Sequence, residues 1–148
     1  MKPFSLTAVL QYRRQLEDSA ATRLVHAQLE LQAKQQEYDE LVDRYTKLLA
    51  RLDQLQDGGI TVEDLLQYEN HLSWLKGQQK KVADELHSAT VKVSQKRRLV
   101  VDRRRDKKIL EKLKDKQNRE WRQYLEKKEA AQLDEIAVLA HDRDQQKT

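Results

Sequence analysis

The chain has 148 residues, of which 36% are charged and 5% are aromatic, and it contains no cysteine. This composition excludes a disulfide framework and thiol chemistry and is typical of a coiled coil or a long solvated helix, with disorder as the competing interpretation. Because the first residues lack the apolar core of a signal peptide and no stretch approaches about 18 apolar residues, we expect a soluble cytoplasmic protein.

The first predicted helix covers about residues 5–56 and carries a heptad pattern. Its core positions alternate at spacings of three and four, which places them along one side of a helix. Twelve of these 15 positions are apolar, a regularity that disorder would not produce. The two series are Leu10, Glu17, Leu24, Leu31, Tyr38, Tyr45 and Leu52, and Leu6, Arg13, Ala20, Ala27, Lys34, Leu41, Leu48 and Leu55.

A glycine pair, Gly58-Gly59, interrupts a chain whose only proline is Pro3. A proline-free run permits helix throughout, and adjacent glycines after Asp57 are where such a run would stop and turn. We therefore predict a turn at residues 57–60. The fold class that follows is all-α: a long antiparallel two-helix coiled-coil hairpin with unequal arms, forming one domain over residues 1–148.

The second predicted helix covers about residues 61–142. Thr61 can cap its start, and Glu63 and Asp64 favour the positive end of the helix dipole. Its apolar seam degrades beyond Val100, where cations fall on core positions, and changes phase from Leu133 onward. The seam comprises Leu65, Tyr68, Leu72, Leu75, Val82, Leu86, Ala89, Val93 and Val100, interrupted by Gln79 and Lys96, and Leu110, Trp121 and Tyr124 keep its register.

Folding about Gly59 makes the two arms unequal. Residue 5 should face about residue 113, so about 30 C-terminal residues have no partner in the hairpin. An amphipathic helix with an uncovered apolar face is a candidate binding element, and self-association through it is the alternative. The apolar residues in this part are Trp121, Tyr124, Leu125, Leu133, Ile136 and Leu139.

A second candidate surface lies near the turn. The heptad assignment points Leu29, Leu49, Leu66 and Trp74 away from the seam. An exposed Trp near a loop is a typical interface anchor, although the ring of Trp74 could instead lie along the stem of Lys81.

Charge is distributed unevenly along the chain. Residues 92–119 contain 13 Lys/Arg and 4 Asp/Glu, a net charge of +9, so the rest of the chain carries −5. Such a block suggests nucleic acid or an anionic membrane as a partner, or simply a solvated helix face. It has no interleaved aromatic residues or known docking motif.

No residue pattern indicates catalysis, a metal or a cofactor. The four histidines, at positions 26, 71, 87 and 141, have no partners at metal-ligand spacing, and neither a phosphate-binding loop nor a nucleophile elbow occurs. A two-helix hairpin also offers no enclosed pocket in which the pKa of a carboxylate would be perturbed. We therefore expect a protein that is not an enzyme.

Both ends of the sequence resemble the FliJ family, a small cytoplasmic component of the bacterial flagellar type III export apparatus. At the start, the similar residues are Phe4-Ser5-Leu6-Thr7-Ala8-Val9-Leu10-Gln11-Tyr12-Arg13, followed by Glu17. Towards the end they are residues 110–114, 124–129 and 133–137. The resemblance implies an antiparallel coiled coil similar to the stalk of rotary ATPases. It further implies contacts with the hexameric export ATPase and the membrane export gate, and a role in handling export chaperones.

By analogy with a rotary stalk, the end that bears both termini would enter the ATPase ring and the Gly58 end would face the gate. The resemblance implies ATPase contacts at Arg13, Glu17, Trp121, Tyr124, Glu129, Leu133, Asp134, Glu135 and Ala137. It implies gate contacts at Leu41, Tyr45, Leu48, Tyr68, Leu72 and Leu75, with Trp74 beside them, although most of these also belong to the predicted seam. A stalk of a virulence-type secretion system or a rotary-ATPase subunit is the alternative within the same class.

Overall fold

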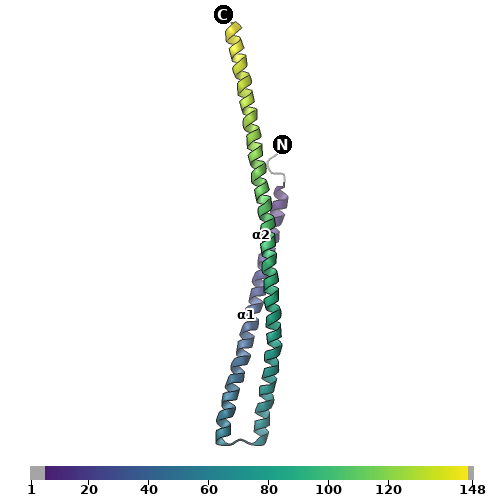
Figure 1. The fold of residues 1–148 in the computed structure, drawn as a ribbon, viewed down its shortest axis with the longest axis vertical. Helices are drawn as coiled ribbons and strands as arrows, with labels where there is room; N and C mark the ends of the chain where they lie inside the picture. The colour runs from purple at the N-terminus through teal and green to yellow at the C-terminus, as the bar shows by residue number, and fades with distance from the viewer. Residues whose placement is uncertain (1–5, 147–148) are drawn as a thin grey trace. The chain divides into compact units, whose positions relative to one another are not determined.

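The structure, a computed structural model, describes residues 6–146. Within this range it consists of two helices, α1 (Thr7–Gly58) and α2 (Val62–Gln146), and contains no strand. In Figure 1 the parts of the two helices nearest to the turn lie antiparallel to each other and are joined by a short connection. The predicted all-α fold with two long paired helices is confirmed. The predicted helix start at residue 5 lies outside the described residues.

The chain divides into two compact units. The turn unit, Asp18–Val101, holds the connection and the adjoining parts of both helices. The terminal unit combines Met1–Glu17 with Asp102–Thr148, so it contains the first turns of α1 and the C-terminal half of α2.

The connection between the helices depends on Gly59 rather than on both glycines. Gly59 has a φ of 86°, a left-handed conformation that is unfavourable for residues with a side chain. Its N–H donates a hydrogen bond to the Gln56 carbonyl at 3.4 Å. Asp57 and Gly58 are helical, so α1 continues past the predicted end at about residue 56. The Thr61 hydroxyl accepts a hydrogen bond from the Asp64 N–H at 3.2 Å and caps α2.

The turn unit is held together by the predicted seam. Leu41, Leu75 and Val82 form its buried centre, and Tyr38, Tyr45 and Leu48 pack against them. Ala20 and Ala27 are also buried, and the other predicted α1 core positions of the unit are at least half-buried. Gln79 interrupts the α2 seam, as predicted, yet it is buried because its amide donates to the Leu41 carbonyl at 3.3 Å.

Ion pairs flank the seam in the turn unit. Lys34 contacts Glu85 across the pair at 2.7 Å, and Lys92 contacts Glu30 at 3.0 Å. The hydrogen bond from Lys34 lowers the pKa of Glu85, and the same contact raises the pKa of Lys34. The charge of Lys34, which occupies a core position of the heptad, is therefore compensated by Glu85 on the other helix.

In the terminal unit, charged residues take over core positions around the buried Leu10. The Glu17 carboxylate accepts hydrogen bonds from Lys107 at 2.5 Å and Arg104 at 3.2 Å, and its side chain is only 14% exposed. The hydrogen bond from Lys107, supported by the one from Arg104, lowers the pKa of Glu17. Arg13 faces Asp106 at 3.6 Å. Polar pairing thus continues the helix contact where apolar pairing stops.

Neutralising Glu17 should lower stability only above acidic pH. Because folding depresses the pKa of Glu17 below its ordinary value of 4.5, the stabilisation is present above 4.5 and is lost as the pH falls through the folded value. We expect Glu17→Gln to cost about 1 kcal/mol at neutral pH and less at about pH 3. Thermal unfolding followed by circular dichroism measures this, with the exposed Asp115→Asn as the matched control. An equal loss at both pH values would contradict the ion-pair explanation.

Gly77 and Gly59 should respond to alanine in opposite directions. A Cβ at Gly77 would meet no atom within 4 Å, and the position lies inside α2, so Gly77→Ala should stabilise by about 0.5–1 kcal/mol. Gly59→Ala should destabilise by about 1–2 kcal/mol because alanine disfavours the left-handed conformation. Urea unfolding measures both. A loss of stability in Gly77→Ala would mean that α2 requires flexibility at this position.

Candidate functional site

The first candidate surface is the C-terminal part of α2, in the terminal unit. Every described residue from 122 to 146 is exposed, whereas the preceding segment alternates between exposed and half-buried positions. Figure 1 shows this part of α2, coloured light green to yellow, continuing beyond the start of α1. Its large exposed apolar side chains are Tyr124, Leu125, Leu133, Ile136, Val138 and Leu139.

These apolar residues gather on one broad side of α2. Trp121 and Leu125 are four residues apart, and Ile136 and Leu139 follow on the same side after whole turns of helix. Leu133 is 66% exposed and Ile136 is 62% exposed, so within the described residues this side has no cover. We call Trp121, Leu125, Leu133, Ile136 and Leu139 the C-terminal apolar face.

The residues predicted to contact an ATPase fall into distinct settings. Trp121 and Tyr124 stack, with ring centroids 5.6 Å apart and planes inclined by 22°, and so present one aromatic unit. Glu129, Leu133 and Ala137 are spaced four apart and share one side of α2 beside that pair.

The remaining predicted ATPase residues are placed less favourably. Asp134 and Glu135 are exposed; Asp134 lies on another side of the helix, whereas Glu135, four residues before Leu139, lies on the side of the aromatic pair. Arg13 and Glu17 are already engaged in ion pairs with α2. Ile136 and Leu139 are exposed neighbours of Leu133, although the family resemblance does not include them among the ATPase contacts. Their helical spacing from Trp121 indicates that they share its side of α2.

The second candidate surface lies in the turn unit. Of the predicted gate residues, Leu41 and Leu75 are buried in the seam, at 8% and 1% exposure, so they act in packing. Tyr45, Leu48, Tyr68 and Leu72 are half-buried, and the Lys76 ammonium lies 4.4 Å from the centre of the Tyr45 ring. An open groove of about 530 Å³ near the connection is lined by Leu48, Leu55, Tyr68 and His71, among others.

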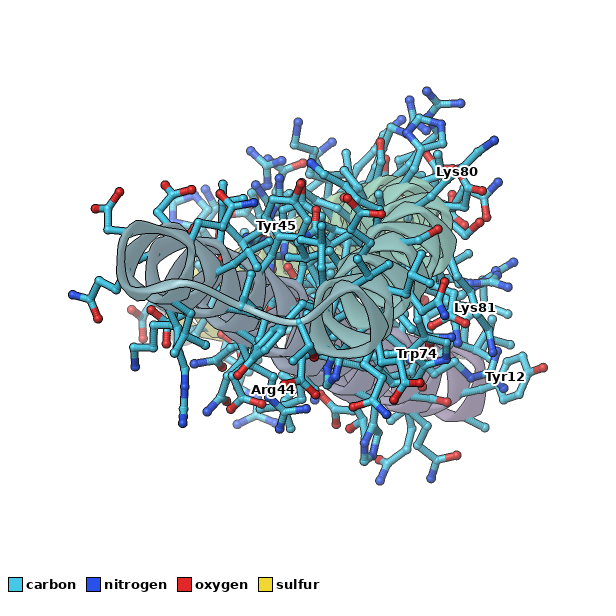
Figure 2. All side chains as sticks on the ribbon, turned by 90° about the horizontal axis from the view of Figure 1, so that it is seen from below. Tyr12, Arg44, Tyr45, Trp74, Lys80 and Lys81 are labelled. Carbon is cyan, nitrogen blue, oxygen red and sulfur yellow. The ribbon has the colours of Figure 1, made fainter. Side chains whose placement is uncertain are left out.

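Trp74 is the exposed member of this second surface. Its side chain is 56% exposed and meets the His71 ring edge-on, with centroids 6.0 Å apart. Figure 2, seen along the helices, shows Trp74 among the side chains that point outward from α2. Trp74 and the groove beside it thus combine an exposed aromatic ring with a half-buried apolar floor.

Chemistry-bearing clusters are missing from the part of the chain that the structure describes. Residues 6–146 contain no group of three or more His, Asp or Glu side chains placed to hold a metal ion. In the same range, neither helix has a stretch long and apolar enough to cross a membrane.

Comparisons with known proteins identify the family. The family described as flagellar FliJ protein matches residues 1–146. Among solved structures, one described as a YscO homolog, CT670 from Chlamydia trachomatis, shares the fold with a TM-score of 0.61 and 18% identity, covering 100% of both chains. The search of curated proteins found no match. Since the family match extends over nearly the whole chain, the protein belongs to the FliJ family of flagellar proteins.

Proposed function

We propose that this protein is a non-enzymatic stalk of the flagellar type III export apparatus that links the hexameric export ATPase to the membrane export gate. Such a protein would reside in the cytoplasm, peripherally at the inner face of the cell membrane, and would serve flagellum assembly and hence motility and chemotaxis. The observation that carries the proposal is the uncovered C-terminal apolar face in a chain of the FliJ family.

The C-terminal apolar face is the proposed ATPase contact. Four exposed apolar side chains and the half-buried Trp121 lie on one side of the helix, and burying this surface in a groove of a partner would be favourable. The stacked Trp121 and Tyr124 add aromatic rings of the kind that dominate binding energy at interfaces. Glu129, next to this face, supplies a charge at its rim.

Trp74 and the groove near the connection form the proposed gate contact. The exposed ring of Trp74 is the anchor, and Tyr68 and Leu48 in the groove provide an apolar floor for a partner side chain. Leu41 and Leu75 would contribute indirectly, by holding this end of the helix pair rigid. Two contact surfaces, one in each unit, suit a protein that connects two partners by contact rather than by chemistry.

The same fold would also suit two related roles, in binding export chaperones and in virulence-type secretion. Export chaperones are further proposed partners, because exposed apolar helix faces bind helical clients. The fold shared with a YscO homolog supports a virulence-type secretion stalk as the second candidate, and a flagellar ATPase as partner distinguishes the two.

Truncation of the C-terminal apolar face should weaken ATPase binding without unfolding the protein. We expect Leu133→Ala with Ile136→Ala to weaken association with the export ATPase about 30-fold or more, since each truncation at an interface centre costs about 1–2 kcal/mol. Both residues are exposed and alanine favours helix, so circular dichroism should not change. Val25→Ala with Leu29→Ala, an equally exposed apolar pair in the turn unit, is the control. Calorimetric titration that gives equal affinities for both double variants would remove this site.

Truncation of Trp74 should affect the gate and spare the ATPase. We expect Trp74→Ala to weaken binding to the soluble domain of the export gate about tenfold, because an exposed aromatic anchor contributes about 1–2 kcal/mol. Val101→Ala removes a similarly exposed apolar side chain of α2 outside this surface and should change little. Biolayer interferometry against both partners measures this. Equal losses for the gate and the ATPase would indicate a general structural effect instead.

A further inference from the structure

Five cations form a straight line along the exposed side of α2 in the terminal unit. Their spacings of three or four residues keep them on one side of the helix over 14 residues, about 21 Å. All five side chains belong to exposed residues. This basic stripe consists of Arg105, Lys108, Lys112, Lys116 and Arg119.

The ion pairs that join the two helices within residues 6–146 do not involve the cations of the basic stripe. The cations that stabilise the helix pair lie elsewhere: Arg104 and Lys107 bind Glu17. Within the stripe, Arg105 contacts Asp102 one turn away at 2.5 Å, and no described carboxylate pairs with the other four cations. Two acidic residues, Asp115 and Glu120, are exposed beside the five cations. The stripe therefore faces solvent as a row of largely uncompensated positive charge.

The surroundings of the basic stripe disfavour two kinds of partner. Ile109, 59% exposed, is the one large apolar side chain exposed between Arg105 and Arg119. A partner helix would have little apolar surface to bury, and exposed ion pairs of fixed geometry contribute little by themselves. Single-stranded nucleic acid needs aromatic platforms, which are missing between these two residues.

We propose that the basic stripe holds this protein against an anionic phospholipid surface. A straight row of cations on a rigid helix can meet a flat surface along its whole length. Attraction to an anionic leaflet adds up over Lys and Arg side chains without requiring fixed pairing geometry. Leu110 and Leu113 of α2 are half-buried rather than exposed, so the contact is electrostatic and leaves the helix outside the hydrocarbon core.

This contact is separate from the proposed ATPase and gate surfaces. The C-terminal apolar face begins at Trp121, beyond the last stripe residue, and Trp74 belongs to the turn unit. Lipid binding can therefore be measured with the purified protein alone, and its outcome does not depend on either protein partner.

The test is co-sedimentation of the full-length protein with phosphatidylcholine vesicles, with and without phosphatidylglycerol, at rising salt. The stripe variant changes four cations to glutamine: Lys108, Lys112, Lys116 and Arg119. The control variant changes four exposed cations elsewhere to glutamine: Arg44, Lys80, Lys81 and Lys128. Three of the control positions are labelled in Figure 2, and both variants lose the same charge.

We expect binding only to vesicles that contain phosphatidylglycerol, with loss of binding between about 0.1 M and 0.5 M salt. The stripe variant should partition about 100-fold more weakly, and the control variant should stay within about fivefold of the wild type. Circular dichroism verifies that both variants are helical. Equal losses in both variants, equal binding to neutral vesicles, or displacement of the protein from vesicles by double-stranded DNA at equal charge would each overturn the proposal.

Discussion

Two helices joined by a short turn can cover each other only along the length of the shorter one. Here α1 has 52 residues and α2 has 85, so the C-terminal part of α2 cannot be covered by this chain. The apolar residues in that part, such as Leu133 and Ile136, stay exposed for this reason alone. The length difference therefore turns one end of a structural helix into a contact surface, and the proposed ATPase contact depends on it.

The seam changes its chemistry along the molecule. In the turn unit, Leu41, Leu75 and Val82 exclude water and make the pair close-packed. In the terminal unit, Glu17 with Arg104 and Lys107 replaces most of that apolar contact. These partly buried ion pairs contribute less than apolar packing and are weakened by salt where they reach solvent, so we infer that the terminal unit opens at lower free energy than the turn unit. A partner that binds near the chain ends meets the more adaptable part of the protein.

Periodicity alone predicted most of this fold. The seam positions of α1 follow from spacings of three and four, and the described ones are buried or half-buried. The helix end at Gly58 was less predictable, because either glycine of the pair could adopt the left-handed conformation that Gly59 takes. Tyr124 continues the predicted register but is 51% exposed, because burial requires α1 beside it; the unequal lengths of the arms, rather than periodicity, predicted this exposure. The pairing of Glu17 with Arg104 likewise depends on helix register, which a sequence pattern does not define. The binding roles of the surface residues depend on partners whose surfaces the chain does not encode.

Gln79 has a mechanical consequence. Its amide is bonded to the carbonyl of one particular residue, Leu41, inside an otherwise apolar stretch. Sliding one helix past the other would break this hydrogen bond before the buried amide reached the carbonyl of the next turn, a barrier that an all-leucine stretch would lack. The turn unit thus resists axial shear at this level. A push or pull delivered to α2 there is passed to α1 as a displacement of the whole unit rather than being lost as slippage between the two helices.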